Sequence, residues 1–298
     1  MTWLVIGANG QLGMALSVVL SSRGIKHASW DSITLDIRSY EDTIRKVSLF
    51  NPPVIINTAA WTYVDGAELD PIKAYLVNTE GAQNLALAAK AVGAVFVHIS
   101  TDYVFSGISN KPWQETDLPA PTSVYGRTKA AGDAAILRNY ESHSYIFRTA
   151  WLYSKWGKNF AKTMIRLALS GDNEVRVVND QYGQPTSAID LANQIVDTVL
   201  AELPFGIYHG TNSGEATWYD FAREVFQLSG GLTARLVPVA SIEFPRLAKR
   251  PTYSVLGHKA WENEGKNKQR VFRMRSWIDA LDEVMPSMIE EVKMENLL

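Results

Sequence analysis

The sequence predicts an α/β protein built on a doubly wound parallel sheet, with a smaller α/β domain in its second half. Over the first 150 residues, short apolar runs alternate with stretches of helical pattern. Strands that are separated by helices favour a parallel sheet. A glycine-rich turn follows the first apolar run and opens the first helical stretch, which is how nucleotide-binding sheets of this class begin.

The elements of the first half follow in order. The expected strands are short runs rich in Val, Ile or aromatic residues, at 3–6, 25–30, 54–57, 94–100 and 144–148. One expected helix covers 12–23 and is closed by Gly24. Another covers 74–92, with Pro71 near its start and Gly93 after it.

The alternation of strand and helix patterns becomes less regular after residue 152. We expect helices at 160–169, 189–200 and 217–228, and strands at 175–179 and 206–210. Residues 240–268 carry few periodic signals, so we expect them to wrap a surface or line a cleft. Residues 275–292 have a helical pattern that Pro286 is expected to break.

These elements suggest two domains. A dinucleotide-binding domain would contain 1–152, and about 174–210 would return to it. A substrate-binding domain would contain 153–173 and 211–298.

Composition excludes several classes of function. The 29 Lys and Arg residues nearly balance the 31 Asp and Glu residues, giving a net charge of −2, so we expect neither nucleic acid nor a membrane surface as partner. The chain has no Cys, and its five His residues are scattered, so no metal site is predicted. We see no signal peptide and no run of ~18 apolar residues, so a cytoplasmic location is expected.

The glycine-rich turn predicts a dinucleotide site and, with it, a Rossmann-type sheet. Its sequence is Gly7-Ala8-Asn9-Gly10-Gln11-Leu12-Gly13, a GxxGxxG spacing. Glycines there permit a tight turn, a close approach of a pyrophosphate to the backbone, and close packing of helix on strand. The N-terminus of the following helix offers N–H groups and a positive dipole end to phosphate.

An acidic residue after the second strand is expected to bind the adenosine ribose. Asp31 stands 18 residues beyond Gly13, close to the ~20 that is usual, and Asp36, beside Ile37, is the rival. A carboxylate there favours NADH over NADPH because it would repel a 2′-phosphate. Arg38 lies near enough to soften that preference, so both cofactors stay open.

Tyr125 and Lys129 carry the strongest chemical signal. Spaced i, i+4 in Tyr125-Gly126-Arg127-Thr128-Lys129, they share one helix face. An ammonium beside the phenol, or an oxidised nicotinamide, would lower the tyrosine pKa from about 10, so that Tyr125 can give a proton to a carbonyl oxygen. The hypothesis requires a phenol that faces the cleft and an ammonium that is not committed elsewhere.

The strand before this helix ends in hydroxyl groups. It runs His98-Ile99-Ser100-Thr101-Asp102-Tyr103, and ligands of parallel sheets lie beyond the carboxyl ends of the strands. Thr101 is therefore expected to hydrogen-bond the substrate oxygen. His98, in mid-strand, is expected to be a packing residue.

These segments resemble the extended short-chain dehydrogenase/reductase family, and within it the branch that reduces dTDP-4-dehydro sugars in dTDP-L-rhamnose synthesis. The resemblance covers nearly the whole chain. It includes the glycine loop, 57–60, Ser100-Thr101-Asp102-Tyr103-Val104-Phe105, 113–117, 125–129, 147–153, 159–164, 180–186 and Arg250-Pro251.

The resemblance implies an activity. It is the NAD(P)H-dependent reduction of the C4 ketone of dTDP-4-dehydro-6-deoxy-L-mannose to dTDP-L-rhamnose, the last step of that synthesis. It also implies roles for individual residues. Tyr125 would be the proton donor, Lys129 its electrostatic partner and ribose ligand, and Thr101 the group that orients the keto oxygen. Gly10, Gln11 and Leu12 would bind the pyrophosphate. The cofactor would be lined by Ala59, Ala60, Trp61 and Thr62, and the sugar nucleotide would be bound by Asp102, Tyr103, Trp151 and Arg250.

Three alternatives stay open. Related sugar 4,6-dehydratases carry Thr-Asp-Glu at the strand end, and Tyr103 replaces that Glu here, which favours a reductase. A reductase or epimerase for another nucleotide sugar would use the same Tyr–Lys chemistry. A third is a non-catalytic dinucleotide-binding regulatory subunit, such as that of methionine adenosyltransferase, which resembles this family.

The resemblance also allows a homodimer and a Mg²⁺ requirement, but the sequence maps no Mg²⁺ site. Glu290, Glu291 and Glu295 are expected to form a solvated helix face. Trp61 stands where relatives commonly have a histidine, which leaves the local shape of the pocket open.

Overall fold

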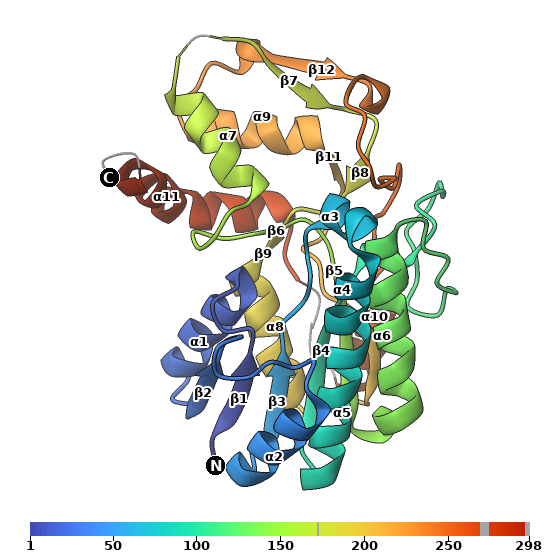
Figure 1. The fold of residues 1–298 in the computed structure, drawn as a ribbon. Coiled ribbons are helices and arrows are strands. Elements are labelled where there is room, and N and C mark those ends of the chain that lie inside the picture. Colours follow the sequence, from blue (N-terminus) through green and yellow to red (C-terminus); the bar gives the residue numbers. More distant parts are fainter. Residues whose placement is uncertain (172, 269–273, 296–298) are drawn as a thin grey trace.

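A computed structural model of the chain describes residues 1–171, 173–268 and 274–295. It has two lobes. The larger lobe surrounds the central sheet and carries the N-terminus, and the smaller lobe contains α7 (Phe160–Leu169), α9 (Trp218–Leu228), β7 (Val175–Val178) and β12 (Leu236–Val239) (Figure 1).

Six parallel strands of the described chain form the central sheet, in the order β10-β5-β4-β3-β1-β2. The chain moves from β1 to β2 on one side and then returns to β3 on the other. The sheet therefore has a switch point between β1 and β3, the place where such sheets bind ligands. This order confirms the predicted doubly wound parallel sheet. Its strands are β1 (Trp3–Ile6), β2 (His27–Trp30), β3 (Val54–Asn57), β4 (Val95–Thr101), β5 (Ser144–Thr149) and β10 (Gly206–His209).

Helices cover both faces of the sheet, which explains why the central strands are apolar on both sides. In β1, Trp3 and Val5 join the core under α1 and α8, whereas Leu4 and Ile6 join the core on the opposite face. The helices of the first face are α1 (Gln11–Ser22) and α8 (Ala188–Leu200), and those of the second are α2 (Tyr40–Phe50), α5 (Gly81–Val92) and α6 (Val124–Tyr140).

The helix expected at 74–92 is not one regular helix. The chain forms α3 (Val64–Leu69), α4 (Pro71–Tyr75), a π-helical turn at Leu76–Glu80, and then α5. The π turn contains the buried Asn78, whose side chain accepts from the Trp61 N–H at 2.8 Å and donates to the Thr128 hydroxyl at 3.1 Å. Apolar periodicity cannot reveal such a turn, because these polar contacts join segments that are distant in the sequence.

The smaller lobe has its own apolar core. It joins buried side chains of α7, α9, β7, β12 and α11 (Trp277–Glu295). Short paired strands connect the lobes: β6 (Leu152–Tyr153) with β9 (Thr186–Ser187), and β8 (Tyr182–Gly183) with β11 (Ala216–Thr217). Short 3-10 turns lie at Asp102–Val104, Glu141–His143, Thr233–Arg235 and Ser241–Glu243.

Three expectations need correction. β7 pairs with β12 of the smaller lobe and not with the central sheet, so the chain does not return to the sheet at residue 174. Residues 240–268, expected to be irregular, include α10 (Lys259–Lys268). Its Trp261 packs into the sheet core and donates to the His209 carbonyl at 2.7 Å. Pro286 lies inside α11 without ending it, because Met285 and Met288 are buried on either side.

We propose a domain division that follows these contacts. The dinucleotide-binding domain would contain 1–152, 188–210 and 258–268, and the remaining described residues would form the substrate-binding domain. Within the described ranges, no helix is long and apolar enough to cross a membrane.

Candidate active site

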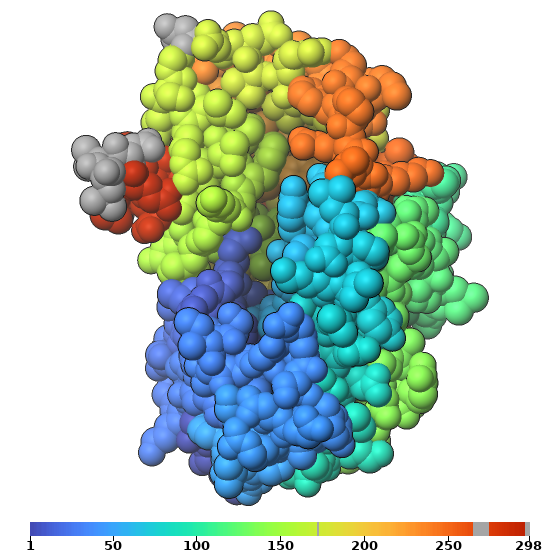
Figure 2. Space-filling model, in the orientation of Figure 1, coloured from blue at the N-terminus to red at the C-terminus, as the bar shows by residue number. Residues whose placement is uncertain are grey.

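A cleft of about 1040 Å³ lies at the carboxyl ends of β1, β2, β3, β4 and β5. Figure 2 shows the surface hollowed where the blue and cyan N-terminal segments meet the yellow-green segment. The cleft brings together every predicted site residue except Gly13 and Arg250. These lining residues are Gly7, Gly10, Gln11, Leu12, Asp31, Asp36, Ile37, Ala59, Ala60, Trp61, Thr62, Thr101, Asp102, Tyr103, Tyr125, Lys129 and Trp151.

The glycine loop forms one wall by close backbone approach. Gly7 has a φ of +81°, and a Cβ there would lie 2.6 Å from the Ala59 backbone nitrogen. A Cβ on Gly13 would lie 2.4 Å from the Gly7 carbonyl oxygen, so Gly13 packs α1 against the turn and does not line the cleft. Gly10 caps α1 without a side-chain hydrogen bond, which leaves the N–H groups of the first turn available to an anion.

Gln11 contributes its backbone to this wall, while its side chain connects the lobes. Its amide donates to the Leu152 carbonyl at 3.4 Å and accepts from Asn159 at 2.9 Å. The side chain is therefore committed to the second lobe.

The two candidate ribose ligands differ in their partners. Asp31 accepts from the backbone N–H of Thr34 at 2.9 Å and from the Asn9 side chain at 3.1 Å. These hydrogen bonds lower the pKa of Asp31. Asp36 is paired with Arg38 at 2.7 Å, which lowers the pKa of its carboxyl. Since Arg38 neutralises Asp36, Asp31 is the better candidate of the two.

The segment after β3 forms the next wall. The Thr58 hydroxyl donates to the Ile6 carbonyl at 2.8 Å, which ties this segment to the glycine loop. The Trp61 indole donates to the Tyr63 carbonyl at 3.1 Å, and the Lys73 ammonium lies 5.2 Å from its ring centroid. The Trp61 indole is therefore fixed at the cleft edge by its own neighbours.

The start of α6 places Tyr125. The Ser123 hydroxyl caps the helix by accepting from the Gly126 N–H at 3.1 Å, and a Cβ on Gly126 would lie 2.2 Å from the Tyr103 carbonyl oxygen. Thr101 lines the same cleft as Tyr125, and burial raises the pKa of Tyr125 above its usual value. The expected lowering of that pKa by Lys129 is therefore wrong for the protein alone, because desolvation dominates in the closed cleft.

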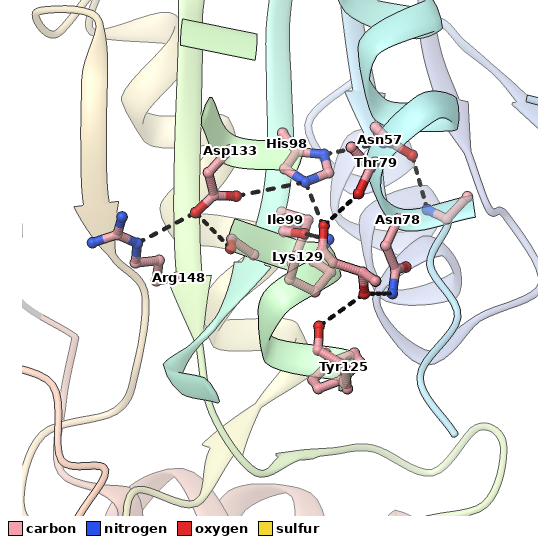
Figure 3. A network of polar contacts seen from close by, with 12 residues as sticks. Asn57, Asn78, Thr79, His98, Ile99, Tyr125, Lys129, Asp133 and Arg148 are labelled. Carbon is pink, nitrogen blue, oxygen red and sulfur yellow. Dashed lines mark hydrogen bonds and ion pairs between the residues drawn. The ribbon is translucent and has the colours of Figure 1, made fainter. Parts of the chain in front are cut away.

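Lys129 lies deeper than Tyr125 and is almost fully buried (Figure 3). Its ammonium donates to the Ile99 carbonyl at 2.6 Å and lies 3.1 Å from His98 Nε2. Burial lowers the pKa of Lys129 to about 8, although Asp133 opposes that shift. The lysine nitrogen has three hydrogen-bonding positions, so these two contacts leave one for the cleft, which Lys129 lines. The Lys129 nitrogen is therefore only partly committed to contacts outside the cleft.

Polar groups also gather at the far end of the cleft. Asp102 is buried and accepts from the Thr101 hydroxyl at 2.9 Å. Its Oδ2 makes no hydrogen bond within the described chain. Burial raises the pKa of Asp102 to about 6. Burial likewise raises the pKa of Tyr103 to about 12.

Arg250 lies behind Tyr103 and outside the cleft lining. Its guanidinium pairs with Asp65 at 2.8 Å and lies 6.0 Å from the Tyr103 ring centroid. The implied contact with a nucleotide diphosphate stays a prediction; Arg250 Nη1 makes no hydrogen bond in the described part of the chain.

Trp151 carries an unusual backbone. Its φ is +43°, which is a true outlier for a bulky residue. Its indole stacks on Trp218 with centroids 3.6 Å apart, and a Cβ on Gly183 would lie 2.4 Å from the same indole. The two neighbours fix the ring at the cleft wall.

Comparison with known proteins identifies the family. The family model for the RmlD substrate binding domain matches residues 1–288. The chain belongs to this RmlD family. It is 43% identical over 290 residues to a dTDP-4-dehydrorhamnose reductase of Streptomyces griseus, covering 96% of this chain and 93% of the relative. It is 41% identical to a dTDP-4-keto-6-deoxy-D-glucose reductase of Streptomyces niveus, covering 95% and 96%.

A solved structure gives the same assignment. The dTDP-4-dehydrorhamnose reductase of Bacillus anthracis, determined in complex with NADP, superposes with a TM-score of 0.89 at 37% identity and covers 96% of this chain and 99% of that one. The predicted fold class and the resemblance to reductases of the extended short-chain family are thereby confirmed.

Sequence reasoning missed several residues that line this RmlD-family cleft or contact the predicted site residues. Thr149 ends β5 at the cleft, and its hydroxyl makes no hydrogen bond in the described ranges. The strand-end argument that selected Thr101 could have found it. Asn78 and Asp65 gave no signal, because their partners are distant in the sequence. His98 is buried as expected, but it contacts Lys129 and is more than a packing residue.

No group of acidic or His side chains in the described residues could bind a metal ion. Glu290 is exposed and Glu291 is half-buried. Glu295 is exposed, as expected, and it also pairs with the buried Lys162 at 2.5 Å. The Mg²⁺ that the resemblance allowed therefore has no site among them.

Proposed function

We propose that this RmlD-family chain is an NAD(P)H-dependent ketoreductase. It would reduce C4 of dTDP-4-dehydro-6-deoxy-L-mannose to give dTDP-L-rhamnose. The observation that carries the proposal is that Tyr125, Lys129 and Thr101 line the same cleft as the glycine loop. A proton donor is thus placed beside a dinucleotide site.

The backbone of the glycine loop supports the proposed dinucleotide site. The close approach at Gly7 and the uncapped first turn of α1 form a cradle for a pyrophosphate. We propose that the backbone of Gly10, Gln11 and Leu12 binds it, that Asp31 binds the adenosine ribose, and that Ala59, Ala60, Trp61 and Thr62 line the nicotinamide half. When bound, NAD(P)H supplies the hydride.

The residues of the chain then transfer one proton to the ketone oxygen. The raised pKa of Tyr125 keeps the phenol protonated at neutral pH, as a donor to a ketone oxygen must be. Thr101 orients the phenol and the keto oxygen, and Lys129 restores the proton. Asp102 would accept a sugar hydroxyl through its free Oδ2, and Tyr103 and Trp151 would form the sugar walls.

The experiment uses purified protein, the ketosugar and NADPH. We expect loss of reduced-nicotinamide absorbance and the appearance of dTDP-L-rhamnose by NMR. Tyr125→Phe should lose at least about 100-fold in kcat while it still binds NADPH. Undiminished turnover by that variant would exclude Tyr125 as the proton donor. Parallel assays with NADH would decide the cofactor preference.

A second candidate is the reduction of another dTDP-4-keto-6-deoxy sugar. The name of the Streptomyces niveus relative, a dTDP-4-keto-6-deoxy-D-glucose reductase, favours this candidate. The two activities share the cleft and differ in the sugar. Competition between the two ketosugars, with product configuration read by NMR, separates them.

A non-catalytic dinucleotide-binding subunit is a weaker candidate, because a pure binder needs no phenol in one cleft with Thr101 and a buried Lys129. Stable co-purification with a partner enzyme and no turnover would favour it. The homodimer and the cytoplasmic location stay predictions, to be checked by mass in solution and by cell fractionation.

A further inference from the structure

A chain of buried polar contacts runs from the cofactor wall to Lys129 (Figure 3). The Ala59 N–H donates to Asn57 Oδ1 at 3.0 Å. Asn57 Nδ2 lies 3.1 Å from His98 Nδ1, and His98 Nε2 lies 3.1 Å from Lys129 Nζ. All three side chains are 1% exposed, so their polar atoms must find partners inside the protein.

The backbone donor at Ala59 sets the direction of every hydrogen bond in this chain. It requires Asn57 to present its oxygen to Ala59 and its amino group to His98. His98 Nδ1 must then accept. A neutral imidazole has one donor and one acceptor nitrogen, so the proton of His98 stands on Nε2.

Two other observations agree with that tautomer. Burial and the charge of Lys129 hold the pKa of His98 well below its usual value, so the ring is neutral. Asp133 Oδ1 lies 3.9 Å from Nε2 and favours a proton there. Asp133 in turn faces Arg148, 3.4 Å away, and Ser100.

The Nε2–H of His98 therefore points at the nitrogen of Lys129. An ammonium has three donors and no acceptor, so it is repelled by this N–H, whereas a neutral amine accepts it with its lone pair. We propose that His98 is a positioning residue which, oriented by Asn57, stabilises the neutral amine of Lys129 and so makes Lys129 a proton donor to the cleft.

This inference rests on the proposed ketoreductase function and assigns the supply of its proton. When the Tyr125 O–H bond breaks and the proton passes to the sugar oxygen, a phenolate remains. An N–H bond of the Lys129 ammonium then breaks, and an O–H bond forms again on Tyr125, through the cleft that both groups line. The lone pair left on Lys129 accepts the Nε2–H of His98, and the amine later takes a proton from solvent. Asp133 on α6 opposes this release, and Arg148 on β5 offsets Asp133.

The first test reads the tautomer directly. Long-range ¹H–¹⁵N spectra of the ¹⁵N-labelled protein separate the two tautomers and the imidazolium, and the His98 signals are those absent from His98→Gln. We expect the neutral Nε2–H form across pH 6 to 9 (about the range centred on the usual His and amine values). An Nδ1–H tautomer or an imidazolium would overturn the proposal, whether or not the protein reduces the ketosugar.

The second test inverts the tautomer. In Asn57→Asp, one carboxylate oxygen still accepts from Ala59 and the other accepts from His98 Nδ1–H, so Nε2 becomes an acceptor for the Lys129 ammonium. Lys129 should then retain its proton to higher pH, and the high-pH limb of kcat/KM should move up by about one pH unit or more. Asn193→Asp on α8, which keeps its contact with Arg23 through Oδ1, is the matched control and should leave the limb in place.

Asn57→Asp also adds a charge, so the same substitution is made in a His98→Gln background. If the effect passes through His98, the shift of the limb should disappear there. A shift that persists would assign the effect to charge alone and overturn the role of His98. If Asn57→Asp does not fold, the spectra of the unchanged protein still decide the tautomer.

Discussion

The glycine loop offers a prediction in which close approach and backbone strain can be separated. Gly7 combines a φ of +81° with a Cβ position 2.6 Å from the Ala59 nitrogen. Gly24 also has a positive φ, +68°, but nothing lies within 4 Å of its Cβ position. Gly24→Ala therefore tests strain alone, and Gly7→Ala tests strain together with a backbone clash.

The expected costs follow from these two contributions. An alanine in the left-handed region costs about 1–2 kcal/mol. Forcing a methyl group against packed atoms adds about 1–3 kcal/mol. We therefore expect Gly24→Ala to lower the free energy of unfolding by about 1–2 kcal/mol and Gly7→Ala by about 2–5 kcal/mol. Gly13→Ala, which has only the clash with the Gly7 carbonyl, should cost about 1–3 kcal/mol.

Urea unfolding measures these stabilities, and titration of NADPH measures binding. Gly24→Ala should bind NADPH like the unchanged protein, because Gly24 lies outside the cleft lining. Gly7→Ala should bind it at least about tenfold more weakly, because the Ala59 segment must move. If Gly7→Ala costs no more than Gly24→Ala and binds NADPH normally, the close approach inferred for the loop is wrong.

Three further predictions concern other parts of the chain. The pKa of Asp102 is raised to about 6, so the folded state binds the proton of this carboxyl group more tightly than the unfolded state does. The contribution of Asp102 to the free energy of unfolding therefore falls as the pH rises from about 4 to about 6. Asp102→Asn should flatten that fall and stabilise the protein at pH 7 by up to about 3 kcal/mol in urea unfolding. Pro286→Ala should raise stability by about 2–3 kcal/mol, since α11 continues through Pro286, and a lower melting temperature would contradict this. Trp218→Leu should remove the stacked-indole signal from near-ultraviolet circular dichroism and raise KM for the ketosugar, with an unchanged KM arguing against a role of Trp218 in orienting Trp151.

The sequence predicts the central sheet well because its inner strands β1, β3 and β5 are buried on both faces. The run at 54–57 matches β3 residue for residue, and the helix at 160–169 matches α7. In both, the apolar period and the bounding turn residues agree with the final packing. The prediction of an irregular segment at 240–268 is wrong because α10 is stabilised by the packing of Trp261 on Phe147 and Tyr208 across the sheet edge. The local apolar periodicity of the sequence cannot predict that contact.

The candidate site divides in the same way. Residues fixed by the strand-end rule, such as Thr101, were predicted from position alone. The contact of Arg250 with Asp65, 185 residues away in the sequence, could not be predicted, and its implied role at the diphosphate stays a prediction. The electrostatics of Tyr125 also escaped prediction, since i, i+4 spacing with Lys129 specifies a shared helix face but not the depth at which each group lies.

Three features of the cleft are locally unfavourable. Trp151 adopts a left-handed backbone, and the Asp102 Oδ2 and Thr149 hydroxyl, at the ends of β4 and β5, have no hydrogen bonds in the described residues. Each such feature costs about 1–3 kcal/mol. All three residues line the same cleft, and sugar hydroxyls would satisfy the two polar atoms. The loss of stability from these three features is therefore best explained by a surface shaped to bind a polar substrate. A chain selected only to bind a dinucleotide through its glycine loop would gain nothing from these features.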